Sequence, residues 1–348
     1  MMKILKRKIS IKYKPFIVAE MSANHNKSFE RAIKIIDLAA KSGADAIKLQ
    51  TYSAEGMTLN LPKKEFKISE KNSLWKGQHL FNLYSKASTP KEWHKDLFQY
   101  AKEKKILCFS SPFDERSVDF LEKFDPPCYK IASFEIVDIP LIRHVAKTGK
   151  PVIVSTGMAS VAEINDALDE LNKWGNNNYA LLKCTSTYPA KASNSNLATI
   201  SHMKKLFNCE IGLSDHTFGI GASLASIVHG STIIERHFTI KRSDGGVDSA
   251  FSLEPHEMKQ LVKESETVWN SIGEVKYGPL QDERQSLLKR RSIYVVRDVK
   301  KGMAITKKDI KRIRPGFGLS PKYWDIVLRM KFKKNIKIGT PLKWDLID

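Results

Sequence analysis

Eight short apolar segments, rich in β-branched residues, recur along this 348-residue chain, and helical patterns separate them. The segments span residues 16–22, 46–52, 107–113, 128–133, 151–157, 179–185, 210–216 and 232–239. Between them apolar residues follow the 3.6-residue period of an amphipathic helix, as in residues 28–43, where Ser28 stands at the N-cap position and Gly43 closes the pattern. Strands that alternate with helices in this way are joined by crossovers and lie parallel.

The eight strand–helix units run from Phe16 to Gly273 and occupy 258 residues, close to the roughly 250 of a (β/α)8 barrel. We therefore predict an α/β fold with a TIM barrel over residues 1–273. A doubly wound sheet is the alternative, but the first unit lacks a glycine-rich phosphate-binding turn. The region from Ser53 to Ser88 is too long for an ordinary loop after a strand, and we expect it to pack over the barrel mouth.

The C-terminal part of the chain has a different pattern. A polar, basic linker over residues 274–290 precedes residues 291–348, which we expect to form a compact, mostly β module. So small a unit has little core of its own and is expected to dock on something larger. The module carries 16 Lys+Arg against 5 Asp+Glu, and so +11 of the net charge of +20. It lacks the interleaved aromatic and basic residues of RNA-binding modules, so we predict no nucleic-acid partner, while attraction of small anions stays open.

Hydropathy and cysteine usage predict the compartment. The mean hydropathy is −0.34, and no stretch approaches the ~18 apolar residues of a membrane span or the apolar run of a signal peptide. The four cysteines (Cys108, Cys128, Cys184 and Cys209) show no CxxC spacing, and three lie in apolar, strand-like runs. Buried thiols in a reducing compartment are the better interpretation. We therefore expect a cytoplasmic protein that does not bind membranes.

Polar residues gather where the predicted strands end, and in a parallel barrel the chemistry takes place at the C-terminal ends of the strands. These residues are Glu20, Lys48, Gln50, Ser111, Lys130, Ser133, Glu135, Ser155, Tyr188, His216 and His237. Lys48 and Lys130 each lie inside an apolar strand pattern, where an unpaired ammonium group would be costly. The two lysines therefore indicate an anion site. The serines are weaker indicators of a site, because serines commonly cap helices or hydrogen-bond to the backbone.

Two histidines end the seventh and eighth segments, His216 in GLSDHT and His237 in IIERHFT. A lone histidine is more often a packed or solvent-facing residue than a ligand. Two at matching ends of neighbouring strands can face one point, and imidazole suits Zn, Fe, Ni or Cu, and also Mn when carboxylate and water complete the shell. The pair indicates a metal site at the barrel mouth.

Nine motifs in order carry a family resemblance: AEMSANHN, KLQTY, KIASFEI, STGM, KCTSTYP, GLSDHT, ERHFT, GGVDSAFS and RPGFG. Together they resemble the sialic acid synthase family over nearly the whole chain, and the C-terminal module resembles that family's antifreeze-like (SAF) domain. Within the family, SANHN, WKGQHLFNLY, CFSSPFD, KIASFEIVDIPLI and DSAFSLEP are most similar to the pseudaminic acid synthases. Ser186 departs from the asparagine usual in neuraminate synthases.

The resemblance implies a transferase that joins phosphoenolpyruvate to the open-chain aldehyde of an acetamido sugar, giving a nine-carbon 2-keto acid and phosphate. The sugar it implies is 2,4-diacetamido-2,4,6-trideoxy-β-L-altropyranose. N-acetylneuraminate or legionaminate synthesis from another acetamido sugar is the alternative. Two further classes stay open: a binding protein whose barrel has lost catalytic activity, and a metal-dependent aldolase that uses pyruvate itself. The barrel is not expected to be inactive, because the set of Glu20, Lys48, Lys130, His216 and His237 is intact.

The resemblance also implies a role for each matching residue. Glu20 would handle protons, which requires hydrogen-bond reach, and His216 and His237 would bind a divalent metal, with Mn2+ expected and Mg2+ or Co2+ as alternatives. Arg314 would enter the barrel of the partner in a domain-swapped homodimer. Phosphoenolpyruvate would be held by Lys48, Lys130, Ser111, Ser133, Ser155 and Ser214. The sugar would be held by Gln50, Glu135, Tyr188 and Asp248, and Ser186 and Asp215 would be further substrate-binding residues.

Overall fold

The computed structural model describes residues 1–69 and 74–348. The chain divides into two compact units, Met1–Gly273 and Glu274–Asp348, and each is described by itself. Residues 70–73, which belong to the segment expected over the barrel mouth, lie outside the described part. Within the described residues no helix is long and apolar enough to cross a membrane.

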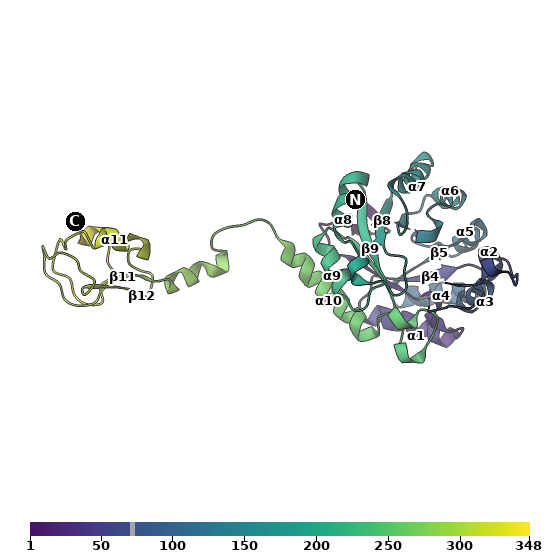
Figure 1. Ribbon diagram of the computed structural model, residues 1–348, viewed down its shortest axis with the longest axis horizontal. Helices are drawn as coiled ribbons and strands as arrows, with labels where there is room; N and C mark the ends of the chain where they lie inside the picture. The colour runs from purple at the N-terminus through teal and green to yellow at the C-terminus, as the bar shows by residue number, and fades with distance from the viewer. Residues whose placement is uncertain (70–73) are drawn as a thin grey trace. The chain divides into compact units, whose positions relative to one another are not determined.

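The first unit is a closed barrel of parallel strands in the order β10-β3-β4-β5-β6-β7-β8-β9, which confirms the predicted TIM barrel. Figure 1 shows the helices arranged around these strands. The strands are β3 (Phe16–Glu20), β4 (Ala46–Thr51), β5 (Leu107–Pro112), β6 (Tyr129–Ile131), β7 (Val152–Ser155), β8 (Tyr179–Cys184), β9 (Glu210–Asp215) and β10 (Ile233–His237). Strand β10 pairs with both β9 and β3 and so closes the barrel.

Alternate residues of each strand face either the interior or the helices, as the two-residue period of a strand requires. On β3, Phe16 and Val18 belong to the buried interior cluster, together with Ile153 and Ile233. Ile17 instead packs in the cluster formed with the surrounding helices. Because of the same alternation, the residues two positions further along each strand also face the barrel interior, closer to the C-terminal ends of the strands.

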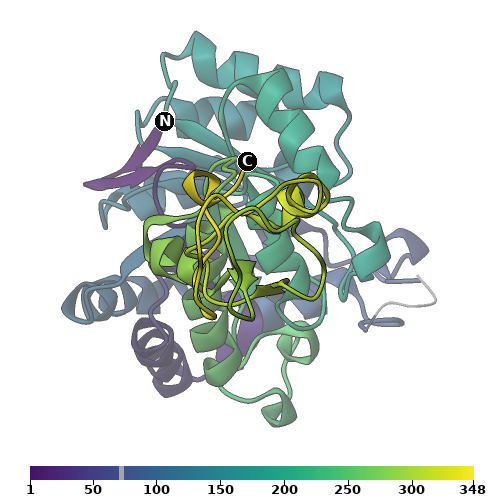
Figure 2. The same ribbon diagram turned by 90° about the vertical axis from the view of Figure 1, so that its left-hand side faces the viewer.

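An N-terminal hairpin covers the barrel interior at the N-terminal ends of its strands. Strands β1 (Met2–Ile4) and β2 (Arg7–Ile9) pair antiparallel, and Met2, Ile4 and Ile9 are buried in the same cluster as the interior residues of the barrel strands. The hairpin is drawn in purple near the N-terminus in Figure 2. Because these side chains pack against the apolar layer, the barrel interior is closed at the N-terminal ends of its strands.

The helices of the first unit are α1 (Phe29–Lys41), α2 (Ala54–Met57), α3 (Leu80–Ala87), α4 (His94–Glu103), α5 (Glu115–Glu122), α6 (Ile139–Ala146), α7 (Val161–Lys173), α8 (Ala198–Phe207), α9 (Gly221–Val228) and α10 (Pro255–Ile272). As predicted, Ser28 caps α1 by accepting a hydrogen bond from the Arg31 amide, and Gly43 adopts a positive φ of 84° after the helix. Cys108, Cys128 and Cys184 are buried, as expected of three of the four thiols.

The segment from Ser53 to Ser88 contains helices α2 and α3, which the sequence analysis did not predict. Helix α3 buries only Leu83 and Ala87, so its apolar pattern is too short to distinguish from a loop. Ala87 packs with Ala23 and Tyr52 beside the ends of β3 and β4. Trp75 of this segment donates a hydrogen bond from Nε1 to the Val247 carbonyl at 3.0 Å, so the segment packs beside the barrel mouth.

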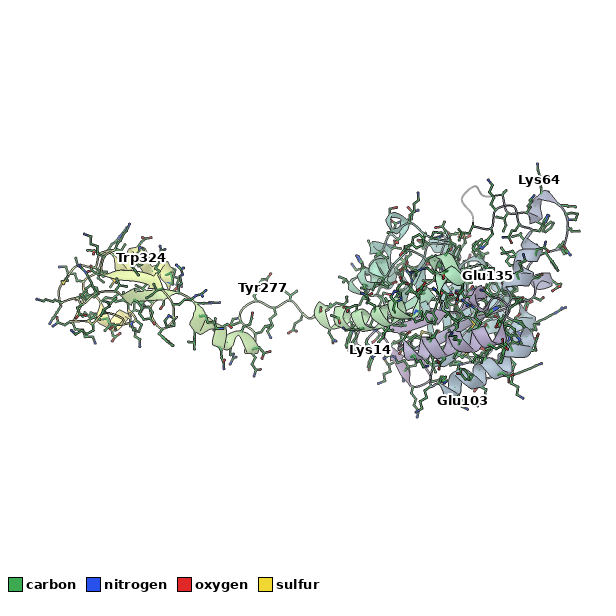
Figure 3. All side chains as sticks on the ribbon, turned by 90° about the horizontal axis from the view of Figure 1, so that it is seen from below. Lys14, Lys64, Glu103, Glu135, Tyr277 and Trp324 are labelled. Atoms are coloured by element: carbon green, nitrogen blue, oxygen red, sulfur yellow. The ribbon has the colours of Figure 1, made fainter. Side chains whose placement is uncertain are left out.

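The second unit is a small module with its own apolar core, whereas the sequence analysis expected so small a unit to have little core. Strands β11 (Ser292–Val295) and β12 (Ile310–Ile313) pair antiparallel, and α11 (Trp324–Val327) is a single turn. Ile293, Ile310 and Phe332 belong to its buried core. Figure 2 shows this module in yellow and green, and Figure 3 labels Trp324 within it and Tyr277, whose side chain is 94% exposed, in the segment that precedes it.

Candidate active site

A layer of buried charges lies above the apolar interior of the barrel. Glu20 ends β3, Lys48 lies on β4, Lys130 on β6 and Glu235 on β10, and all four are 5% exposed or less. Lys48 Nζ is 2.8 Å from Glu20 Oε2 and 3.3 Å from Glu235 Oε2, while Lys130 Nζ is 3.9 Å from Glu235 Oε1. Two ammonium groups and two carboxylates thus form one connected network inside the barrel.

Serine hydroxyls surround both lysines. Lys130 Nζ donates to Ser155 Oγ at 2.6 Å, Lys48 Nζ lies 3.4 Å from Ser111 Oγ, and Ser214 Oγ donates to Glu235 Oε1 at 2.9 Å. A compact anion that enters this layer meets ammonium groups and hydroxyl donors on strands β4, β5, β6, β7 and β9. This set suits phosphate and carboxylate oxygens, because charge-assisted hydrogen bonds to such oxygens are the strong ones.

The two carboxylates of the layer differ in acidity. Burial raises the pKa of Glu20 to about 7, and Lys48 opposes that rise. Burial would also raise the pKa of Glu235, but Lys130 and Lys48 outweigh it and hold that pKa well below its usual range. Two acids whose surroundings separate their pKa values in this way can take different roles. Glu20 is the one that can exchange a proton near neutral pH.

Gln50 and Glu135 lie at the edge of this layer. Gln50 Nε2 donates to Glu20 Oε1 at 3.2 Å and so fixes the second oxygen of that carboxylate. Glu135, labelled in Figure 3, lies on the short turn that follows β6. Burial raises the pKa of Glu135 to about 7, and its Oε2 has no hydrogen-bond partner among the described residues. A polar substrate group at the mouth could satisfy that oxygen.

His216 and His237 lie together beyond the charged layer, each two residues further along its strand than Ser214 or Glu235. Their ring centroids are 5.3 Å apart. His216 Nδ1 lies 3.0 Å from the Thr185 carbonyl, so Nδ1 carries the proton and Nε2 holds the lone pair. His237 Nδ1 is buried without a hydrogen-bond partner among the described residues, and burial lowers the pKa of His237 well below its usual range, which keeps it neutral.

The two imidazoles fit a divalent cation, since they lie close together and Nδ1 of His237, which stays neutral, is buried with no hydrogen-bond partner among the described residues. No group of three or more His, Cys, Asp and Glu side chains in the described chain could hold a metal by itself. A cation bound here would therefore take water or substrate oxygens for its remaining ligands.

Aromatic and acidic side chains enclose the two histidines. The Tyr188 ring centroid is 4.5 Å from that of His216, and the Phe251 centroid is 4.9 Å from that of His237. Asp248 Oδ2 is 3.9 Å from His237 Nδ1 and accepts a short hydrogen bond from Ser22 Oγ. Trp75, 6.0 Å from Tyr188 between centroids, extends this aromatic wall.

Four of the predicted residues lie apart from this interior network. Asp215 faces outward from β9 and forms a buried ion pair with Arg236 at 2.5 Å, while it also accepts from Ser223. Both carboxylate oxygens of Asp215 thus have partners on the outer face of the strand. The hydroxyl groups of Ser133 and Ser186 both lie beside the Cα of Gly157, where there is no room for a Cβ. Arg314 belongs to the second unit, where its side chain is exposed.

The SANHN motif, quoted for its family likeness, performs a structural role at its centre. Asn24 Nδ2 donates to the Phe238 carbonyl at 2.9 Å and to Ser252 Oγ at 2.8 Å. His25 is fully buried against Trp93. These two side chains fasten the loop after β3 to the segment after β10. Ser22, through its hydroxyl, and Ala23, through its amide, reach the site by donating to Asp248.

The sequence analysis missed two interior residues, Glu235 and Cys184. Glu235 lies next to Arg236 in ERHFT, a motif from which the sequence analysis singled out only His237. Counting back two positions from His237, however, places Glu235 on the same face of the strand. Cys184, at the end of β8, has its Sγ 3.9 Å from His216 Nδ1.

Comparison with known proteins agrees with the geometry of this site. Residues 35–277 match the NeuB family, and residues 290–348 match the SAF domain. The chain is 43% identical to a pseudaminic acid synthase of Campylobacter jejuni over 95% of this chain and 96% of the relative, and 40% identical to that of Helicobacter pylori over 96% and 98%. The structure of an N-acetylneuraminic acid synthetase from Leptospira borgpetersenii, 33% identical, superposes with a TM-score of 0.73 over 82% of this chain and 94% of the other.

The chain belongs to the NeuB family of sialic acid synthase-type enzymes. It combines the family's barrel with a C-terminal SAF domain, as the sequence motifs predicted.

Proposed function

We propose that this protein is a pseudaminic acid synthase, which condenses phosphoenolpyruvate and water with 2,4-diacetamido-2,4,6-trideoxy-β-L-altropyranose. The observation that carries the proposal is the buried layer in which Lys48 and Lys130 lie among serine hydroxyls, beneath two histidines at the open end of the barrel. The relatives named pseudaminic acid synthases are 40–43% identical, against 33% for the N-acetylneuraminic acid synthetase. That difference supports the diacetamido sugar.

In the proposed reaction a carbon–carbon bond forms between C3 of phosphoenolpyruvate and the aldehyde carbon of the open-chain sugar. Water adds to C2, and phosphate leaves. Lys48, Lys130 and the serines bind the phosphate and carboxylate of phosphoenolpyruvate. Glu20, whose pKa burial raises to about 7, exchanges the proton with the aldehyde oxygen or with the water, and Gln50 holds its other oxygen. Closure of the barrel by the N-terminal hairpin limits bulk water to the open end.

Metal dependence is part of the proposal, with His216 and His237 as the protein ligands and Mn2+ as the expected ion. Bound there, the cation supplies Lewis-acid polarisation of the aldehyde oxygen. Mg2+ or Co2+ are the alternatives. The supporting observations are the short distance between the two imidazoles, the lowered pKa of His237 and its buried Nδ1, which has no hydrogen-bond partner in the described structure.

A domain-swapped homodimer is also part of the proposal. Arg314 lies in the SAF domain, and its guanidinium can donate hydrogen bonds to an acetamido carbonyl of the sugar. The basic charge of the module would attract phosphoenolpyruvate, the anionic substrate. The unpaired thiols of the described chain agree with a cytoplasmic site of action.

The test is phosphate release from phosphoenolpyruvate with a panel of sugars. The diacetamido trideoxy sugar is expected to give the highest kcat/KM, because a site built around its second acetamido group leaves polar groups unpaired when that group is absent. Equal or higher kcat/KM with N-acetylmannosamine would instead assign the protein as a neuraminate synthase. Turnover of pyruvate in place of phosphoenolpyruvate would assign an aldolase.

A further inference from the structure

Glu235 connects the two buried lysines of the charged layer. Its two carboxylate oxygens point to different ammonium groups, Oε2 to Lys48 at 3.3 Å and Oε1 to Lys130 at 3.9 Å. Ser214 Oγ donates to Oε1 at 2.9 Å and fixes the carboxylate from the neighbouring strand β9. Glu235 is 5% exposed, so water contributes little to holding it in place.

The two lysines depend on Glu235 to different degrees. Lys48 has a second and closer carboxylate, Glu20. The other close partners of Lys130 are neutral, Ser155 Oγ at 2.6 Å and the Ile131 carbonyl at 3.1 Å. Among the described residues, Glu235 is therefore the one carboxylate within ion-pair distance of Lys130.

We propose that Glu235 is a positioning residue of the anion site, whose carboxylate holds the ammonium groups of Lys48 and Lys130 as a pair that receives the phosphate and carboxylate of phosphoenolpyruvate. The inference rests on the proposed function. Without this carboxylate two buried cations would face each other with nothing between them, and their repulsion would turn the side chains apart.

The charge on Lys130 is the property that removal of Glu235 should alter most. Burial lowers the pKa of Lys130 to about 8, and Glu235 is the largest of the influences that oppose this fall. The other groups that face Lys130 or influence its charge are Lys48 on β4, Glu20 on β3, Cys184 on β8, Glu135 after β6 and His237 on β10. Since only the protonated amine binds phosphate well, anion binding weakens as pH rises through the pKa of Lys130.

The experiment measures the affinity for phosphoenolpyruvate by calorimetry, without sugar, at pH 6.5 and pH 8. Full-length wild-type protein is compared with Glu235→Gln. Glu210→Gln is the control, because Glu210 is also buried on a barrel strand and paired with a lysine, Lys204 at 3.2 Å, but lies at the opposite end of β9. We expect Glu235→Gln to raise Kd about fivefold at pH 8, because a fall of about one unit in the Lys130 pKa from about 8 would lower the protonated fraction by about that factor, and to raise Kd less at pH 6.5. Glu210→Gln is expected to match wild type at both pH values.

A second variant covers the case in which Glu235→Gln does not fold. Glu235→Asp keeps the charge but shortens the reach, so it should raise the KM for phosphoenolpyruvate severalfold while kcat changes less. Wild-type affinity in either variant, or a Glu235→Gln to wild-type ratio that is the same at both pH values, would overturn the positioning role alone. Folded wild-type protein that does not bind phosphoenolpyruvate at all would overturn the proposed function, and the role of Glu235 with it.

Discussion

The Glu20 carboxylate and the Lys48 ammonium group form a buried ion pair 2.8 Å long between neighbouring strands, and burial raises the pKa of the acid although the cation opposes that rise. The same cation helps to keep Glu235 ionised. Glu20, at the end of β3, is therefore the carboxylate of this layer that can exchange a proton near neutral pH.

Glu20→Gln should lower kcat by about 10²–10⁴-fold, the usual contribution of a general acid or base. The amide keeps the size of the side chain and can still contact Lys48, so affinity for phosphoenolpyruvate should change little. Stopped assays of phosphate release, together with calorimetric binding, separate the two effects. A fall in affinity that matches the fall in kcat would assign Glu20 to binding instead.

His216→Ala and His237→Ala should each abolish measurable turnover and weaken Mn2+ binding, because each removes one of the two imidazoles proposed to hold the ion. Mn2+ binding is followed by electron paramagnetic resonance, and folding by circular dichroism. His202→Ala, an exposed residue on α8, is the control. Full activity after exhaustive chelation would end the metal proposal.

Gly157→Ala should impair the site without disturbing the barrel. A Cβ at this position would collide with Ser186 Oγ and lie 2.9 Å from Ser133 Oγ, so both hydroxyls must shift. A displacement near 1 Å can cost up to about a hundredfold in rate, and we expect kcat/KM to fall at least about tenfold. Gly221→Ala, where a Cβ meets nothing within 4 Å, is the matched control. Unchanged kinetics in Gly157→Ala would show that neither serine needs its present place.

Arg314→Ala should remove most of the activity and leave the assembly intact, and Arg314→Lys should restore little, since one ammonium cannot replace two parallel hydrogen bonds. Deletion of residues 291–348 should leave a folded barrel with the same loss. Mixing Arg314→Ala subunits with Glu20→Ala subunits tests the swap, because some mixed dimers would regain one complete site. No recovery after verified subunit exchange would favour a contact within one chain.

The barrel should lose stability as pH falls from about 6.5 to 4, and His94 should account for part of the loss. His94 is buried between Thr51 Oγ1 at 2.7 Å and the Pro90 carbonyl at 3.0 Å, and burial lowers its pKa to about 4. Between these pH values the unfolded chain binds a proton that the folded protein does not, which costs up to about 3 kcal/mol. Urea titrations at several pH values give the free energy of unfolding as a function of pH. This free energy should fall less steeply with decreasing pH for His94→Gln than for wild type or the exposed-site control His202→Gln.

The sequence predicted the barrel because strand and helix periods are local properties, and it predicted the lysines because ammonium groups inside apolar strands need partners. It did not predict helix α3, whose apolar face covers only Leu83 and Ala87. It also overlooked Glu235. The face that a residue occupies is set by the two-residue period of the strand rather than by residue type, and counting back from His237 places Glu235 in the interior.

The N-terminal hairpin has a consequence for the order of events in each catalytic cycle. Because Met2, Ile4 and Ile9 close one end of the interior, both reactants and both products must pass through a single opening. The lysines lie deeper than the histidines, so a sugar already seated at the mouth would obstruct the way to the lysines. Steady-state kinetics should therefore be sequential and ordered, with phosphoenolpyruvate binding first. At high concentration the sugar should inhibit the reaction, because it forms a dead-end complex with the free enzyme that phosphoenolpyruvate cannot enter.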